Sequence, residues 1–254
     1  MNPRAAVMRR MRHFVDFEMA LLERSMHEAA PYASGALLDV GCGDKPYEAI
    51  FAPHVNRYVG AEYEDTYSSS ANASKHKANV LYSGDRLPFE NDEFDTVLCN
   101  QVAEHVPDPD ALFRELVRVL RPGGRLIFTV PFSYRIHSEP TDFHRFTRYA
   151  LTNYSDRHGL QVDLLKPRGG FWTVIGQKLT SHMALKYARL RREIQALGGM
   201  GYEAPEEKGP RYWALPIVAP AILAVAAATR LLEKLEPDDS DTIGYLLIAT
   251  KRRP

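Results

Sequence analysis

The chain has 254 residues, 45% of them hydrophobic, and its 32 Lys and Arg residues balance 32 Asp and Glu residues for a formal net charge of +0. This length and composition suit one domain with a sizeable core and some additional elements. The balanced charge gives no support for nucleic-acid binding. The two cysteines, Cys42 and Cys99, show no metal-ligand spacing, so we expect no metal site and buried thiols in a reducing compartment.

The first predicted element is a helix over residues 4–30. Apolar side chains recur at helical spacing between Phe14 and Met26, and Pro31 would end the helix. The N-terminus is basic, but no apolar core follows it, so we expect no signal peptide. The favoured interpretation is a helix that packs on the domain and keeps its arginines in water.

The most informative stretch is LLDVGCGDKPY, residues 37–47. Its apolar run is typical of a buried parallel strand and ends in Gly41 and Gly43, with Asp39 two residues before the first glycine. Glycines permit a sharp turn and the close approach of a ligand. Because a strand, a glycine turn and a helix form the nucleotide-binding geometry of open α/β sheets, we predict a cofactor site here that includes Cys42.

A second strand is predicted over residues 57–62, and it ends in the acidic residue Glu62. A carboxylate has two oxygens with several lone pairs, so it can accept hydrogen bonds from both hydroxyls of a ribose. The ring of Tyr63 could cover one face of an adenine. The alternative is a surface acid at the end of a strand.

A third strand is predicted over residues 78–81, after a polar segment with the composition of a loop or a frayed helix. An Asn or Asp at this point can accept a hydrogen bond from an adenine amino group. We favour Asn79, with Val80 beside it, over Asp85, because Asp85 also suits a cap for the turn that follows the strand.

The fourth predicted strand, residues 95–100, ends at Asn100 and Gln101. In a doubly wound sheet this end lies beside the first glycine loop. His105 follows. Histidine as a residue type exchanges protons near neutral pH, so a base role is open for this residue. The alternative is that Glu104 and His105 shape the turn.

Five further segments follow the glycine stretch in a fixed order: Leu87-Pro88-Phe89, Phe94-Asp95, Glu104-His105-Val106, Arg121-Pro122-Gly123-Gly124 and Leu126–Pro131. Together with that stretch, residues 35–165 and the last strand resemble a class I S-adenosylmethionine (SAM)-dependent methyltransferase of the small-molecule type. Lys45 stands where that family often has a third glycine.

The resemblance implies an α/β fold, a doubly wound, mostly parallel sheet of seven strands of the Rossmann-like methyltransferase kind, and S-adenosyl-L-methionine as cofactor. It implies that Glu62 binds the ribose hydroxyls and that a backbone carbonyl at Asn100 or Gln101 faces the methionine ammonium. N-terminal helices often form a lid over the cofactor in this family, which is the alternative interpretation of the helix over residues 4–30.

Titratable side chains crowd the segment after the fifth strand, residues 131–147. It leaves the edge of the sheet where the methyl acceptor must lie, so catalytic or substrate roles are predicted for His137, Asp142, His144 and Arg145. The alternative is a structural loop in which Asp142 pairs with Arg145 while Phe143 and Phe146 plug the core. A similar stretch, HxxPxDFxRFT, recurs in a bacterial branch of the family that is often linked to glycan, lipid or secondary-metabolite pathways.

Strand six is predicted over residues 160–165 and strand seven over 242–250, and the long connection between them is an insertion. Residues 171–197 have a helical, apolar and then basic pattern, and a Gly/Pro/Glu linker follows. The predicted segments are an N-terminal helical cap (1–34), the SAM-binding core (35–169), a helical insertion before the last strand (170–240) and the last strand with a basic tail (241–254).

The stretch of residues 212–228 is almost wholly apolar, contains two prolines and is shorter than the ~20 residues that a spanning helix needs. We expect a buried helix that caps the domain or forms a homodimer face. The alternatives are an apolar substrate cavity and a peripheral membrane contact.

These patterns predict a cytoplasmic SAM-dependent methyltransferase whose acceptor is a small molecule of apolar, lipid-linked or glycan-linked character, without nucleic acid. One rival is a SAM-fold binding or scaffold subunit without turnover. A nicotinamide-dependent reductase is the other rival, and the absence of a third glycine from its Gly-x-Gly-x-x-Gly fingerprint speaks against it.

Overall fold

The computed structural model describes residues 10–64, 77–187 and 211–253, which fold into two compact units. The first, the sheet unit, comprises residues 25–132, 143–166 and 245–254. The second, the helical unit, comprises residues 1–24, 133–142 and 167–244. Segment 133–142 therefore groups with the insertion and the N-terminus, whereas the sequence pattern assigned it to the core. The predicted linker over residues 198–211 lies, apart from Arg211, outside the described residues.

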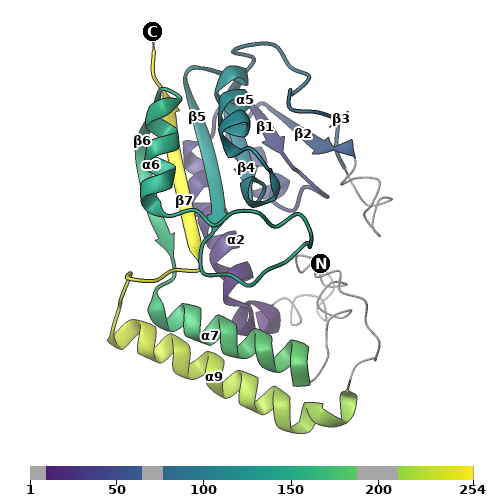
Figure 1. Ribbon diagram of the computed structural model, residues 1–254, viewed down its shortest axis with the longest axis vertical. Coiled ribbons are helices and arrows are strands. Elements are labelled where there is room, and N and C mark those ends of the chain that lie inside the picture. Colours follow the sequence, from purple (N-terminus) through teal and green to yellow (C-terminus); the bar gives the residue numbers. More distant parts are fainter. Residues whose placement is uncertain (1–9, 65–76, 188–210, 254) are drawn as a thin grey trace. The chain divides into compact units, whose positions relative to one another are not determined.

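A seven-stranded sheet has the order β3-β2-β1-β4-β5-β7-β6 (Figure 1). Strand β1 pairs in parallel with both β2 and β4, so the order reverses between β1 and β4. The predicted doubly wound, mostly parallel sheet is confirmed, and its ligand crevice is expected at the carboxyl ends of these strands. The strands are β1 Ala36–Val40, β2 Arg57–Tyr63, β3 Val80–Tyr82, β4 Phe94–Asn100, β5 Leu120–Pro131, β6 Leu160–Arg168 and β7 Gly244–Lys251.

The helices of the sheet unit include α3 (Glu48–Phe51), α5 (Pro109–Val119) and α6 (Arg148–Arg157). Phe113 of α5 stacks on Tyr154 of α6, with ring centroids 5.1 Å apart, and also contacts Phe128 of β5. Helices α5 and α6 therefore pack side by side on the sheet. The side chain of Asp108 caps α5, as its sequence position indicates, because Oδ1 accepts the N–H groups of Asp110 and Ala111.

Strand β5 starts at Leu120, earlier than the pattern predicts. The sequence Arg121-Pro122-Gly123-Gly124 indicates a turn, yet these residues continue the strand, with an irregular register against β4. Gly124 allows this course because a Cβ there would lie 2.9 Å from the backbone oxygen of Asp95. Both cysteines are free and buried, as expected.

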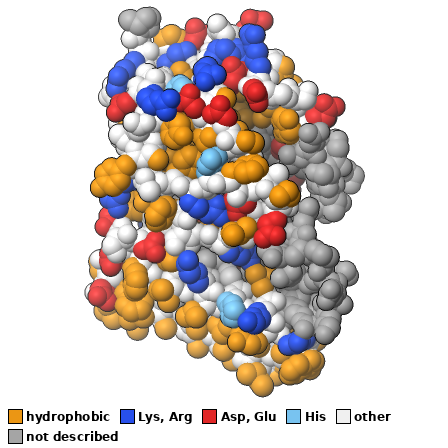
Figure 2. All heavy atoms as spheres, viewed as in Figure 1, with side chains coloured by type: hydrophobic (Ala, Val, Ile, Leu, Met, Phe, Trp, Pro, Cys, Tyr) orange, Lys and Arg blue, Asp and Glu red, His pale blue; other side chains and the backbone are white. Residues whose placement is uncertain are grey.

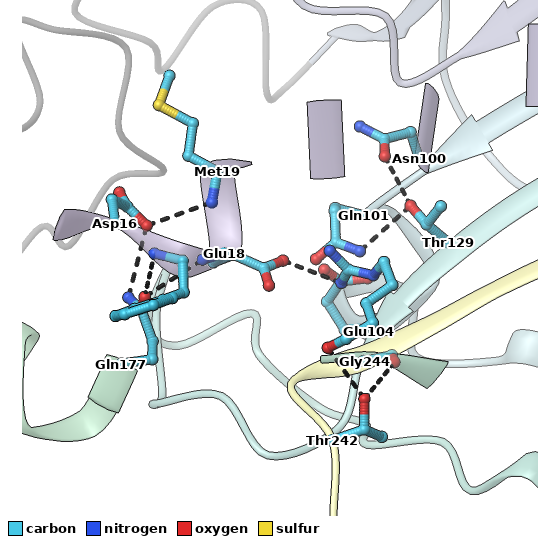
Figure 3. Close-up of polar contacts among 12 residues, drawn as sticks. Asp16, Glu18, Met19, Asn100, Gln101, Glu104, Thr129, Gln177, Thr242 and Gly244 are labelled. Atoms are coloured by element: carbon cyan, nitrogen blue, oxygen red, sulfur yellow. Dashed lines mark hydrogen bonds and ion pairs between the residues drawn. The ribbon is translucent and has the colours of Figure 1, made fainter. Parts of the chain in front are cut away.

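The N-terminal helix is not continuous: residues 10–15 are helical, the helix breaks at Asp16, and α2 (Phe17–Ala29) begins after it. Asp16 Oδ1 accepts the N–H of Met19, and Gln177 Oε1 accepts the N–H groups of Phe17 and Glu18 (Figure 3). These bonds satisfy the first N–H groups of α2. The sequence missed the break because its main acceptor comes from the insertion.

The insertion is helical, as predicted, and its helices α7 (Phe171–His182) and α9 (Leu215–Leu235) lie side by side (Figure 1). Their backbones approach closely at Gly176, where a Cβ would lie 2.3 Å from Thr229 Oγ1. Glu233 Oε2 accepts hydrogen bonds from both the N–H and the hydroxyl of Thr173, each at 2.8 Å.

The apolar helix is longer and more exposed than predicted. With the preceding 3₁₀ turn it runs from Tyr212 to Leu235, 24 residues, and by length and composition alone it could cross a membrane. Only 22% of its most apolar stretch is buried, and Trp213 and Ile217 are each 75% exposed. The estimate of a helix too short to span a membrane was wrong because the helix continues past Ala228 into a polar last turn. Among the described residues, the expected burial of this helix is not found.

A buried ion pair anchors α2 in the helical unit. Arg168 lies 2.9 Å from Glu18, and both side chains are almost fully buried. Burial raises the pKa of Glu18, while the Arg168 charge opposes that rise. Replacing Arg168 with Met should therefore cost about 3–5 kcal/mol, because a buried carboxylate loses its counter-charge.

Chemical denaturation of Arg168→Met measures this loss. The matched control is Arg252→Met, because Arg252 and Asp156 form an ion pair in which both side chains are more than half exposed. The control should change stability little. Equal losses in the two variants would contradict an anchoring role for Arg168.

Candidate active site

The loop after β1 is tied to the end of β2. The N–H groups of Gly41 and Cys42 donate to the carbonyl of Ala61, at 2.9 and 3.2 Å. The N–H of Gly43 donates to Glu62 Oε2 at 2.7 Å. The residues predicted from the glycine stretch and the acid predicted at the end of β2 are thus brought together.

Gly41 and Gly43 meet different structural requirements. Both have a positive φ, +71° at Gly41 and +51° at Gly43, which favours glycine. A Cβ on Gly41 would lie 2.4 Å from Cγ2 of Val102, so this position serves packing. No atom of the described residues lies within 4 Å of a Cβ built on Gly43. The Gly43 position therefore leaves room for a ligand to reach the backbone.

Lys45 adopts the conformation that a third glycine would supply. Its φ is +55°, and its ammonium donates to Asn79 Oδ1, an oxygen that also accepts the N–H of Gly60 at 2.8 Å. Lys45 and Asn79 therefore hold the loop against β2. Both lone pairs of the Asn79 oxygen are used within the protein. A contact of Asn79 with adenine remains a prediction and requires the bond from Lys45 to open.

Glu62 is 5% exposed and oriented by two backbone donors. Oε2 accepts from Gly43, and Oε1 accepts the N–H of Tyr63 at 3.0 Å. Each carboxylate oxygen retains a further lone pair, so the pair can still accept from two ribose hydroxyls. The Tyr63 ring meets Tyr82 edge to face, 5.6 Å between centroids, and Val80 begins β3 opposite Ala61.

Asp39 is buried beneath the glycine loop. The Tyr58 hydroxyl donates to Asp39 Oδ2 at 2.6 Å. Burial raises the pKa of Asp39 to about 7, with the Glu62 charge adding to the rise, and the hydrogen bond from Tyr58 opposes it. Asp39 therefore links β1 to β2, and its predicted cofactor contact remains a prediction. The role of Tyr58 was not predicted, although a tyrosine in the strand next to a buried acid is a signal for such a hydrogen bond.

The ends of β4 and β5 form a small polar network (Figure 3). The Thr129 hydroxyl donates to Asn100 Oδ1 at 2.6 Å and accepts from Gln101 Nε2 at 3.2 Å. Gln101 has a φ of +54°, uncommon for a residue other than glycine and frequent at functional sites. Thr129 fixes both side chains, so the predicted contact with a methionine ammonium would fall to the backbone.

In the helical unit, the segment after β5 orients a histidine. His137 is fully buried, and its Nδ1 lies 3.2 Å from Asp142 Oδ2, which also accepts the His137 backbone N–H at 2.9 Å. Tyr134 meets the imidazole edge to face. A carboxylate at Nδ1 favours the tautomer with a proton on that nitrogen and a lone pair on Nε2.

The other predicted catalytic residues belong to the sheet unit. His144 Nε2 lies 3.3 Å from the carbonyl of Pro107, and Arg145 donates to the carbonyl of His144. His105 is 24% exposed, with its ring 3.9 Å from Glu104. The Glu104 carbonyl accepts the N–H groups of Phe143 and His144.

The structural-loop alternative for this segment is confirmed for Phe146 and wrong for Phe143, and its pairing of Asp142 with Arg145 stays a prediction. Phe146 is buried in the core, as that alternative requires, whereas Phe143 is 49% exposed. Of the two rings, Phe146 therefore packs in the core and Phe143 does not. The catalytic roles predicted for this segment remain predictions.

Residues 38–128 match the family described as "Methyltransferase domain". An uncharacterized methyltransferase of Mycobacterium leprae (strain TN) is 38% identical over 140 residues, which cover 51% of this chain and 51% of that protein. Another, from Mycobacterium avium (strain 104), is 36% identical over 137 residues, covering 50% and 53%. The chain thus spans about half the length of the curated relatives it matches.

Solved structures agree with this fold. A chain of the complex between the Haloferax volcanii Trm112 methyltransferase activator and a methyltransferase gives a TM-score of 0.52 at 17% identity, covering 99% of this chain and 95% of that one. A SAM-dependent methyltransferase of Archaeoglobus fulgidus gives 0.52 at 14%, covering 93% and 95%. The cyclase SpnF gives 0.51 at 20%, covering 91% and 81%. At such identities these likenesses show the fold alone.

Residues 38–128 thus match a methyltransferase domain, and the chain shares the fold of a solved SAM-dependent methyltransferase. S-adenosyl-L-methionine is therefore the cofactor against which this site is compared. The described residues fit this cofactor. Gly43 leaves space at the loop backbone, and the buried Glu62 carboxylate is oriented with lone pairs to spare. Both lie at the carboxyl end of the sheet, near the reversal of strand order.

The open space at Gly43 can be tested against a second glycine. We expect Gly43→Ala to weaken SAM binding by at least ~10-fold, because the added methyl group enters the space assigned to the ligand. Gly84→Ala is the matched control, since Gly84 also has a positive φ, +75°, and no described atom within 4 Å of an added Cβ.

Calorimetric titration of SAM into both variants measures the difference. Both substitutions should lower the melting temperature similarly, because the backbone strain is similar. Equal SAM affinities in the two variants would place the cofactor away from Gly43.

Proposed function

We propose that this protein transfers the methyl group of SAM to a small-molecule acceptor of apolar, lipid-linked or glycan-linked character. The observation that carries the proposal is the bond between the Gly43 N–H and the buried Glu62 carboxylate at the carboxyl end of the sheet. It provides a fixed acceptor group for ribose hydroxyls next to an open stretch of backbone. A cytoplasmic location remains a prediction from the sequence.

Within this proposal each residue has a physical task. When bound, SAM supplies a positively charged sulfonium with a transferable methyl group. Glu62 holds the ribose, Gly43 admits the cofactor to the loop, and Tyr63 covers an adenine face. Gln101 and Asn100 set the backbone that faces the methionine moiety. Orientation of the acceptor alone can contribute ~7–11 kcal/mol in the best intramolecular cases.

His137 and His144 are each held by a neighbouring group that leaves one ring nitrogen available to accept a proton. Asp142 orients His137, and the Pro107 carbonyl engages Nε2 of His144, which leaves the lone pair on Nδ1. A base is required if the acceptor atom belongs to a hydroxyl or an amine, and none is required for a carboxylate or thiolate. His144 is the more accessible candidate, because His137 is fully buried. Arg145, Asp142 and His105 are proposed to position these groups and the acceptor.

Two other functions use the same fold. SpnF, a structural neighbour, is described as a cyclase, so the fold by itself does not determine the reaction. A binding subunit would retain the pocket without turnover. The oriented histidines favour an enzyme over a binding subunit, because a pocket that only binds SAM does not require them.

The protein is first incubated with methyl-labelled SAM and small-molecule extracts, and the compound that becomes labelled identifies the acceptor. Single-turnover rates are then measured with that acceptor. For a base role, His144→Gln should lower the single-turnover rate by ~10²–10⁴, because glutamine can donate to Pro107 but cannot take a proton. His137→Asn is the parallel variant, with an amide in place of the Nδ1–H that points at Asp142.

Melting temperature and SAM affinity, measured on the same preparations, separate loss of a base from loss of folded protein. Unchanged single-turnover rates in both variants would remove these histidines from the mechanism. The absence of labelled product with any extract, despite SAM binding, would favour the binding subunit.

A further inference from the structure

The outward face of α9 carries only apolar side chains over most of its length. No charged residue occurs from Tyr212 to Thr229. The exposed residues up to Leu231 are Tyr212, Trp213, Pro216, Ile217, Ala219, Pro220, Leu223, Ala224, Ala227, Ala228 and Leu231. A contiguous apolar face of this length is unusual on a free surface and marks an interaction site.

The opposite face of α9 is fixed to protein. Ile222, Ala226 and Thr229 are buried in the helical unit. Arg230 donates to the carbonyl of His13 at 2.9 Å, and its guanidinium lies 4.4 Å from the Phe14 ring centroid. A helix with one face packed on protein and one apolar outer face can lie flat along a membrane surface. A helix that crossed the membrane would instead place lipid around the polar groups with which Arg230 interacts.

Helix α7 extends the apolar face and adds positive charge. Phe171, Ile175 and Leu179 recur every four residues and are exposed, so they form one stripe. Lys178 is exposed in the last turns of α7, and Lys186 is exposed in the π-helical turn Met183–Tyr187 that follows it. Figure 2 shows hydrophobic side chains gathered over α7 and α9, with basic side chains beside them. Apolar and basic groups therefore share one surface.

A cationic hollow opens beside this stripe, within the helical unit. It has a volume of ≈ 570 Å³. Its lining includes Lys178 and His182 of α7, Lys186 of the following π-helical turn and Arg135 of the segment after β5. Glu139 is the acidic residue in its lining. Three cationic side chains against one carboxylate favour an anionic group as its occupant.

We propose that α7 and α9 form a membrane-docking face that inserts between the headgroups of an anionic phospholipid surface, with the hollow taking a lipid phosphate. Trp213 and Tyr212 have the amphipathic rings that favour the headgroup level. The apolar stripes supply insertion, and the lysines supply attraction to negative lipid. A second copy of this chain would carry lysines on the same face, whereas anionic lipid complements their charge.

This inference goes beyond methyl transfer and does not depend on it. Flotation of the full chain with vesicles tests it without acceptor or SAM. The protein should float with vesicles of phosphatidylcholine and phosphatidylglycerol and far less with phosphatidylcholine alone, and added salt should weaken the binding. Failure to float with the anionic vesicles would overturn the proposal.

Variants of the outer face sharpen the test. Trp213→Glu and Ile217→Glu should each lower the partition coefficient by ~10-fold or more, since each removes a large inserted side chain. Tyr149→Glu is the matched control, because Tyr149 is 79% exposed in the sheet unit, and it should have no effect. Lys178→Glu should lower binding about fivefold, on anionic vesicles only.

The melting temperature of each variant reports whether the fold is kept. Equal losses for Tyr149→Glu and Trp213→Glu would overturn the proposal. Light scattering measures whether the protein is a dimer. If Ile217→Glu dissociates a dimer and the protein does not bind vesicles, this face is an interface with a second copy of the chain and the membrane proposal is overturned.

Discussion

The hydrogen bond from the Gly43 N–H to Glu62 Oε2 is the contact on which the cofactor region depends. It joins the turn after β1 to the end of β2 and orients a carboxylate that is 5% exposed. A buried carboxylate is costly unless donors compensate it, and the backbone of Gly43 and Tyr63 supplies them. The bond therefore fixes the carboxylate and the loop in one geometry before any ligand binds.

Hydrogen bonds of Asp39 and Lys45 stabilise the geometry of the loop and of the Glu62 carboxylate. Asp39, held by the Tyr58 hydroxyl, links the two strands beneath the turn. Lys45 closes the turn with a φ of +55° and donates to Asn79. A left-handed conformation costs a residue with a Cβ about 1–2 kcal/mol. The burial of the lysine stem against β2 offsets part of that cost, so a lysine can replace the third glycine.

The sequence predicts local features well. The strands that end at Val40 and Asn100, the glycine turn and the Asp108 cap each follow from neighbouring residues, because strand burial, positive φ and capping are set within a few positions. The pairing of Gly43 with Glu62 was also within reach, since both residues end adjacent strands.

Tertiary partners explain what the sequence could not predict. The break at Asp16 depends on Gln177, which lies 161 residues away in the chain. The engagement of Asn79 depends on the conformation of Lys45. The exposure of α9 could not be foreseen, because a run of apolar residues reports a preference for apolar surroundings and does not distinguish a protein core from a lipid surface.

The two units divide the proposed work between cofactor and surroundings. The sheet unit contains the glycine loop and the Glu62 carboxylate, which are built on parallel strands and are proposed to hold SAM. The helical unit contains the Asp142–His137 pair and an outer apolar face with basic neighbours.

Calorimetric titration of SAM into the wild-type protein, Glu62→Ala and Glu64→Ala tests whether Glu62 holds the cofactor. The wild type should bind SAM in the micromolar range and Glu62→Ala at least tenfold more weakly, because charge-assisted hydrogen bonds contribute ~1.5–3 kcal/mol each. Glu64→Ala, which removes an exposed acid two residues away, should bind as the wild type does. Unchanged affinity in Glu62→Ala would mean that Glu62 does not bind the ribose.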